Sequence, residues 1–190
     1  MRSPFYFVVK PLNGRRYDNI RRIGDVDLIT SVSQEDHTVA NRFAEVVSVP
    51  NGYTGDIVTG DTLLVHHNTF KIYYDMKGQE RSGTSFLMDD LFFVDDDQYF
   101  MYKHNGEWNT HSKYCFVKPM EKRDSYIKKG GVYEPLIGIV KYSNDELTRL
   151  GVSVGDEVSF EPDSEYEFEV DGEKLYRMFT KNITIKWQTT

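Results

Sequence analysis

The sequence has little of what usually ties a chain to a membrane or to the cell exterior. It contains one cysteine, Cys115, so no disulfide can form within the chain, as is typical of a reducing compartment. Its apolar runs are all much shorter than the roughly 18 residues of a membrane span, and the first residues lack an apolar segment of signal length. We therefore expect a cytoplasmic protein with no membrane partner.

Signatures of catalysis are also missing. The sequence has no phosphate-binding glycine loop, dinucleotide fingerprint or nucleophile elbow. His66 and His67 are adjacent, and because successive strand residues point to opposite faces, we do not expect them to share a metal ion. We expect a protein that is not an enzyme and has no cofactor, catalytic residue or metal site. The other candidate ligands lack the spacing of a zinc or calcium site: they are His104, His111, Cys115 and Asp95-Asp96-Asp97.

The charge balance argues against nucleic acid as a partner. The net charge is −7, and binding to phosphates normally requires a basic surface. The basic cluster of Arg15-Arg16 and Arg21-Arg22 is interpreted as the solvated flank of a loop. Aromatic residues make up 14% of the chain, which allows either a base-stacking platform or apolar packing. Without a basic groove beside them we favour packing in the core and between domains, with one ring of each adjacent pair inward and one outward, for Tyr73, Tyr74, Phe92, Phe93, Tyr99, Phe100 and Tyr102.

What the sequence has in abundance is β pattern. Short runs rich in Val, Ile, Phe and Tyr alternate with turn signals such as Asn105-Gly106 and Asp171-Gly172. The second pair lies between two alternating runs and predicts a hairpin. Only the segment from Asn144 to Leu150 is helix-like, with Asn144 as its cap. The predicted fold class is all-β, built from small barrels.

The β pattern occurs twice in the same order. The four pairs of matching segments are Phe7 to Leu12 with Phe116 to Met120, Phe43 to Val49 with Leu136 to Tyr142, Gly60 to Val65 with Gly155 to Phe160, and Phe86 to Val94 with Arg177 to Lys186. The repeat predicts two domains, residues 1–97 and 113–190, which are joined by a connecting hairpin over residues 98–112 and packed together.

The two copies differ between their first two strands. The first copy has about fifteen more residues there than the second. They lie in a segment over about residues 14–42, whose polar part, residues 25–38, lacks strand periodicity and should be mobile in isolation. The second copy is predicted to lack such a segment. Long loops in small β domains are usually functional or disordered, so this segment is the candidate site.

The order of motifs in the first copy resembles that of the GroES co-chaperonin family. The order of segments is the same as in that family: a strand ending in Val-Lys-Pro, a mobile segment, a Glu-Val-Val strand and then Val58-Thr59-Gly60-Asp61. Phe70-Lys71 and the run from Phe86 to Leu91 continue the pattern at similar intervals. The resemblance covers residues 5–94 and, more faintly, 113–187. It implies two small, partly open GroES-like β-barrels in tandem.

In that family, a short apolar motif in the mobile loop binds the chaperonin. The matching residues here are Val26, Asp27, Leu28, Ile29 and Thr30. The resemblance therefore implies a co-chaperonin that caps a GroEL-like chaperonin ring, assists protein folding and forms a homo-oligomeric ring, a heptamer.

Two departures from the family pattern stand out. Asp27 interrupts the apolar motif, and the loop from Pro50 to Thr59 is too short for the roof hairpin of the bacterial protein. Such divergence would suit a virus-encoded protein of the host cytoplasm. The alternative function is a structural or adaptor protein, such as a virion component, that uses its barrels for assembly without binding a chaperonin.

Overall fold

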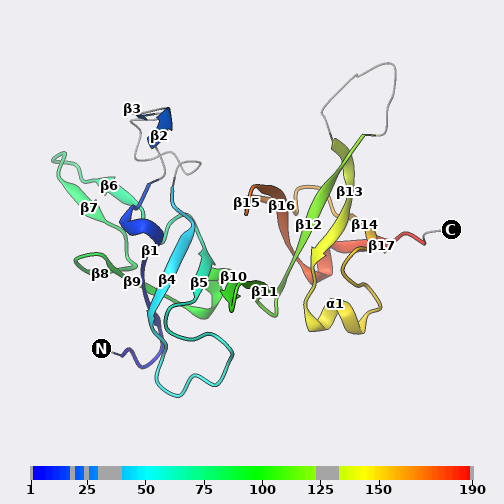
Figure 1. Ribbon diagram of the computed structural model, residues 1–190, viewed down its shortest axis with the longest axis horizontal. Helices are drawn as coiled ribbons and strands as arrows, with labels where there is room; N and C mark the ends of the chain where they lie inside the picture. Colours follow the sequence, from blue (N-terminus) through cyan, green and yellow to red (C-terminus); the bar gives the residue numbers. More distant parts are fainter. Residues whose placement is uncertain (1, 18–19, 24–25, 30–39, 123–132, 189–190) are drawn as a thin grey trace. The chain divides into compact units, whose positions relative to one another are not determined.

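The computed structural model describes residues 2–17, 20–23, 26–29, 40–122 and 133–188, with residues 20–23 and 26–29 described by their backbone pairing. The chain divides into two compact units, Met1–Trp108 and Asn109–Thr190. Each unit is built around one main β-sheet (Figure 1). The predicted all-β fold is confirmed, and neither sheet closes on itself, as expected of partly open barrels.

Unit 1 contains a seven-stranded sheet in the order β11-β10-β5-β4-β1-β9-β8. Its strands are β1 (Phe7–Pro11), β4 (Phe43–Ser48), β5 (Thr62–Val65), β8 (Phe86–Met88), β9 (Leu91–Val94), β10 (Tyr99–His104) and β11 (Glu107–Thr110). Short 3-10 turns, η1 (Leu12–Gly14) and η2 (Asp96–Gln98), follow β1 and precede β10. Two further hairpins form separate two-stranded sheets: β2 (Ile20–Ile23) with β3 (Val26–Ile29), and β6 (Ile72–Tyr74) with β7 (Glu80–Ser82).

The core of unit 1 follows from alternation along its strands. Every second residue of a strand faces the same side of the sheet, and these positions are occupied by large apolar side chains. Burying each one stabilises the fold by about 1.5–3 kcal/mol. The core residues on strands are Phe7, Val9, Ala44, Val46, Leu63, Val65, Phe92, Val94 and Tyr99, and Ile57 and Phe70 join them from the connections between strands.

Unit 2 contains a six-stranded sheet in the order β15-β16-β12-β13-β14-β17. Its strands are β12 (Tyr114–Glu121), β13 (Tyr133–Tyr142), β14 (Glu157–Phe160), β15 (Tyr166–Val170), β16 (Glu173–Phe179) and β17 (Ile183–Lys186), with the turn η3 (Thr180–Asn182) before the last strand. The helix α1 (Asp145–Arg149) lies between β13 and β14. The core consists of Cys115, Val117, Val140, Leu147, Val152, Val158, Phe160 and Met178.

The turn and helix signals of the sequence are confirmed. At Asp171-Gly172 and Asn105-Gly106 both residues have positive φ, between 49° and 86°, which is the backbone that two-residue hairpin turns need. The Asn144 side chain accepts a hydrogen bond of 2.8 Å from the backbone N–H of Leu147 and so caps α1. Its amide also donates to the Tyr114 carbonyl, at 3.0 Å, and to Thr180 Oγ1, at 2.7 Å.

The two units repeat one strand order. Starting at the β8 edge, unit 1 reads β8-β9-β1-β4-β5-β10, and unit 2 reads β15-β16-β12-β13-β14-β17. The register repeats as well, because Val9 pairs with Val46 after a bulge in unit 1, and Val117 pairs with Val140 after a bulge in unit 2. The internal duplication predicted from the sequence is therefore present in three dimensions.

One of the four predicted matches is wrong, and another, Phe43 to Val49 with Leu136 to Tyr142, is shifted by one residue, because Val46 corresponds to Val140 and Ala44 to Gly138. Residues 86–94 form the hairpin β8–β9, whose counterpart by sheet order is β15–β16, residues 166–179. The matched segment 177–186 instead runs from the end of β16 through η3 into β17, the counterpart of β10. Alternating apolar residues are common to every strand, so the pattern alone did not fix the alignment.

The hairpin that was predicted to connect the two domains belongs instead to the main sheet of unit 1. The strands β10 and β11 within residues 98–112 extend the first sheet, and the boundary between the units falls within β11, after Trp108. The prediction that the second copy lacks a mobile segment concerns the β12–β13 connection, of which residues 123–132 lie outside the described residues.

Candidate functional site

The candidate partner-binding residues lie in the insertion between β1 and β4. Val26, Asp27, Leu28 and Ile29 form the strand β3, which pairs antiparallel with β2, and Thr30 lies outside the described residues. The expectation that this part of the insertion has no strand is therefore wrong. The hairpin forms its own two-stranded sheet and is not part of the main sheet of unit 1.

The sequence contained a signal for this hairpin that our prediction missed. Ile20 is paired with Ile29, and Arg22 with Asp27. β-branched residue types and opposite charges at facing positions are typical of antiparallel pairs, and the two runs are separated by Gly24-Asp25, a short connection with a glycine. Neither run has a clear strand signal when taken alone, and only their facing positions indicate the hairpin.

The two ends of the insertion are held together at its base. Tyr17 and Ala40 form an antiparallel bridge, and the backbone N–H of Asn41 donates to the Arg16 carbonyl at 2.9 Å. The Asn41 amide donates to the carbonyls of Leu12, at 3.0 Å, and Arg15, at 2.7 Å, and its Oδ1 accepts from Phe43 N–H at 2.9 Å. We call Arg16, Tyr17, Ala40 and Asn41 the insertion base.

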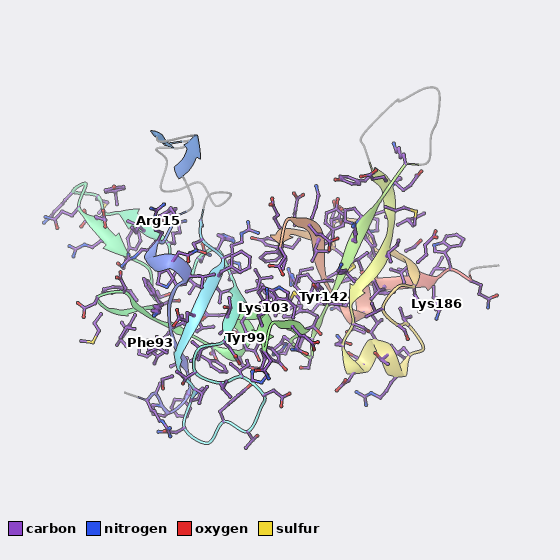
Figure 2. All side chains as sticks on the ribbon, in the orientation of Figure 1. Arg15, Phe93, Tyr99, Lys103, Tyr142 and Lys186 are labelled. Atoms are coloured by element: carbon purple, nitrogen blue, oxygen red, sulfur yellow. The ribbon has the colours of Figure 1, made fainter. Side chains whose placement is uncertain are left out.

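Arg16 ties the insertion base to the rest of unit 1. Its guanidinium donates to Ser82 Oγ in β7 at 3.0 Å. It also lies over the rings of Phe86 and Phe92, 5.3 and 4.8 Å from their centroids, within cation–π range. Arg16 is half-buried. Arg15, which is labelled in Figure 2, is exposed. Interpreting both arginines as a solvated flank was therefore wrong for Arg16.

Tyr17 makes a second connection to the same hairpin. Its hydroxyl accepts a hydrogen bond of 2.8 Å from the backbone N–H of Ile72 at the start of β6. Partial burial raises the pKa of Tyr17, although the bond from Ile72 opposes the shift, so the hydroxyl stays neutral at physiological pH. Both strands of the β6–β7 hairpin are thus bonded to residues that immediately precede the insertion.

The Gly-Asp turns at the start of β5 and β14 are alike in both units. Asp61 Oδ2 accepts from Val58 N–H at 2.8 Å, and Asp156 Oδ2 accepts from Ser153 N–H at 2.7 Å. A basic side chain from the neighbouring strand meets each carboxylate: His104 at 3.0 Å and Lys186 at 2.6 Å. The hydrogen bond from Lys186 is the main reason that the pKa of Asp156 is lowered. These pairs brace the turn in each unit.

The connection between β4 and β5 differs from that between β13 and β14. In unit 1 the loop lies on the core, with Ile57 buried and Tyr53 packed edge-on against Phe7 at 5.0 Å. In unit 2 the same place is occupied by α1. The short loop from Pro50 to Thr59 therefore covers the core.

His66 and His67 do not point to opposite faces of a strand as predicted. The strand β5 ends at Val65, so the opposite-face argument does not apply to His66 and His67, and their ring centroids lie 4.1 Å apart. Within the described ranges, no group of three His, Cys, Asp or Glu side chains could hold a metal ion. None of the described helices combines the length and apolar sequence that a membrane span requires.

The aromatic pairs follow the predicted pattern only in part. Phe92 is buried and Phe93 half-buried, while Tyr99 and Phe100 are both buried. Tyr73 and Tyr74 are both exposed, by 45% and 50%, which neither core packing nor alternation explains.

No protein-family model matches the chain, and a search of curated proteins finds no significant match.

Proposed function

We propose that the protein is a co-chaperonin that caps a GroEL-like chaperonin ring and assists protein folding, without being an enzyme. The observation that carries the proposal is the insertion after β1, which presents the strand Val26–Ile29 on a hydrogen-bonded base. In the GroES family, which the sequence resembles, the chaperonin-binding motif lies in the loop after the first strand. The duplicated open sheet supports the tandem form of that fold.

The physical mechanism requires only weak individual contacts. Leu28 and Ile29 would enter an apolar groove of the chaperonin as part of an extended segment, a common mode of peptide recognition. One such contact binds weakly, but a homo-oligomeric ring presents several copies at once. The resulting effective concentration makes capping strong and still reversible, and a heptamer would match a seven-fold chaperonin.

The second units are proposed not to contact the chaperonin through a loop of their own. They lack a counterpart of the Val26–Ile29 motif, so alternating the two units around one ring would leave every other binding site empty. The cytoplasm, or the host cytoplasm for a virus-encoded protein, is the proposed location.

The test compares capture by a GroEL-like chaperonin ring in the presence of nucleotide. The double variant Leu28→Ser/Ile29→Ser should no longer co-elute with the ring, while its melting temperature stays close to that of the wild type. The matched control is Leu150→Ser/Val154→Ser, which removes two exposed apolar side chains from unit 2 and should bind normally. A large loss of stability in the first variant would show that the pair supports the fold.

The same experiment addresses the alternative function. If the wild-type protein assembles but ignores chaperonin rings with and without nucleotide, it is a structural or adaptor protein and the proposal is wrong.

A further inference from the structure

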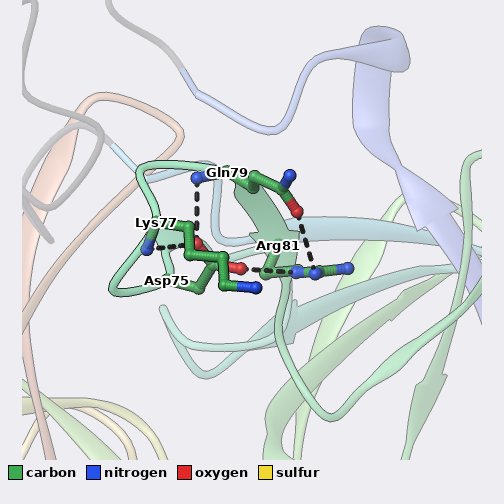
Figure 3. Close-up of polar contacts among 4 residues, drawn as sticks. All are labelled: Asp75, Lys77, Gln79 and Arg81. Atoms are coloured by element: carbon green, nitrogen blue, oxygen red, sulfur yellow. Dashed lines mark hydrogen bonds and ion pairs between the residues drawn. The ribbon is translucent and has the colours of Figure 1, made fainter.

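The β6–β7 hairpin is a hydrogen-bonded element with an exposed apolar end. Its strands pair from Ile72 with Ser82 to Tyr74 with Glu80. Beyond the last pair, Asp75 organises the turn, because its Oδ1 accepts from the backbone N–H groups of Lys77 and Gln79 at 2.9 and 3.0 Å (Figure 3).

A second layer of bonds fixes the outgoing strand. Arg81 Nε donates to Asp75 Oδ2 at 3.1 Å, and Arg81 Nη2 donates to Gln79 Oε1 at 3.1 Å (Figure 3). The hydrogen bond from the backbone N–H of Gln79 is the main reason that the pKa of Asp75 is lowered, and the bonds from Lys77 N–H and Arg81 add to it. The turn is therefore held by a charged acceptor, which makes stronger hydrogen bonds than a neutral one.

This well-ordered turn displays side chains that a solvated turn does not need. Met76 is fully exposed, at 106%, and Tyr73 and Tyr74 are about half exposed. Methionine adapts to irregular apolar surfaces, and tyrosine offers a rigid apolar ring with a polar end. Tyrosine and methionine are enriched in the cores of protein interfaces.

The hairpin is connected to the proposed chaperonin-binding insertion. Tyr17 is bonded to β6 through Ile72, and Arg16 to β7 through Ser82. Both residues belong to the insertion base, from which the proposed chaperonin-binding strand extends. A partner that binds the insertion therefore comes close to the β6–β7 hairpin, because this hairpin is bonded directly to the insertion base.

We infer that the end of the β6–β7 hairpin, formed by Tyr73, Tyr74 and Met76, is a second contact for the same chaperonin partner, on an apolar surface beside the groove that takes Leu28 and Ile29. The inference rests on the proposed function. The hairpin is preorganised by Asp75, so its contact adds affinity with little further ordering. Arg16 and Tyr17 are positioning residues that hold the two contacts in a fixed relation at the insertion base.

The experiment measures equilibrium binding of the full-length protein to a GroEL-like ring with nucleotide. Tyr74→Ser/Met76→Ser should bind about 10-fold more weakly than wild type, as expected when exposed anchor residues are truncated, with an unchanged melting temperature. The control Leu150→Ser/Val154→Ser should bind like wild type. In addition, a photo-crosslinking residue at position 76 should form a covalent adduct with the ring, and the same residue at position 150 should not.

The outcomes separate the two proposals. If wild type binds, Leu28→Ser/Ile29→Ser fails to bind and Tyr74→Ser/Met76→Ser binds like wild type, the second contact is overturned and the co-chaperonin function stands. If wild type does not bind, both are overturned. The variant Tyr17→Phe tests the coupling: the Ile72 amide should exchange faster with solvent and binding should weaken, whereas faster exchange with unchanged affinity would show that Tyr17 has a structural role only.

Discussion

A few residues carry the geometry on which the rest depends, and Asn41 is the clearest case. It lies where the insertion rejoins the sheet, and it bonds to the carbonyls of Leu12 and Arg15 on the other side of the insertion. Each such bond contributes roughly 0.5–1.5 kcal/mol. Nothing in the sequence marked Asn41, because an asparagine before a strand is also an ordinary turn residue.

Gly138 is a second residue that the sequence did not mark. It lies in β13 at the position that Ala44 occupies in β4. A Cβ there would lie 2.6 Å from the Lys118 carbonyl oxygen and closer still to Val117 Cγ1. The backbones of β12 and β13 are therefore too close for any side chain at this position.

We predict that Gly138→Ala lowers the free energy of unfolding by about 1–3 kcal/mol, because overpacking forces neighbouring groups to shift. Denaturant unfolding followed by circular dichroism would measure this. The control is Gly83→Ala, whose new Cβ would meet its nearest neighbour, the Lys71 carbonyl oxygen, at an ordinary 3.4 Å and should change stability little. Equal stability of the two variants would show that β12 and β13 can separate without loss.

At the scale of elements, the β15–β16 hairpin is joined to the middle of its sheet by charge. Glu173, at the start of β16, accepts from Lys118 in β12 at 2.9 Å and from Lys141 in β13 at 2.7 Å. Hydrogen bonds from Lys141 and then Lys118 lower the pKa of Glu173 from 4.5 to about 2. The folded state therefore favours the ionised carboxylate.

This shift predicts a pH-dependent contribution to stability. Because the folded-state pKa is lowered, the contribution is complete above pH 4.5 and is lost as the pH falls towards 2. Glu173→Gln should be less stable than wild type at pH 7, and the difference should shrink steadily between pH 4.5 and 2. Thermal unfolding at several pH values and low salt would reveal it. A difference that persists unchanged at pH 2 would mean that the ion pairs are not its cause.

The elements also show what could be predicted from the sequence and why the rest could not. Turn chemistry and capping are local, so Asp171-Gly172, Asn105-Gly106 and the Asn144 cap were recognised from neighbouring residues alone. The β2–β3 hairpin was missed because its signal lies in facing pairs such as Arg22 and Asp27. The contacts of Arg16 and Tyr17 with β6 and β7 join residues more than fifty positions apart, which no local pattern encodes.

At the scale of the whole molecule, the duplication was visible because strand order and the Gly-Asp turn repeat together. The third match, Gly60 to Val65 with Gly155 to Phe160, is confirmed to the level of single hydrogen bonds: Gly60 N–H donates to the Val46 carbonyl and Gly155 N–H to the Val140 carbonyl, both at 2.8 Å. A turn that needs a glycine with positive φ, here 97° and 93°, constrains sequence more than a strand does. The connections between strands carry no such constraint and diverged.

We predict that both units fold without the insertion. Replacing residues 18–39 with a four-residue Gly-rich turn keeps Tyr17, Ala40 and Asn41, and a shorter loop should raise the free energy of unfolding by roughly 1–2 kcal/mol through a smaller closure entropy. Chaperonin capture should be lost. Calorimetry and co-elution would test the two effects. A marked fall in melting temperature would show that the insertion supports the sheet.

The insertion base has a consequence for how this protein can evolve. The insertion base fixes both ends of the insertion at the sheet. The stretch between these ends can therefore be replaced without changing the fold around it. Its length and sequence can drift under selection from a changing partner while the scaffold stays under selection for folding alone. A lineage could thus acquire a new binding specificity by substitutions within residues 18–39 without passing through an unfolded intermediate.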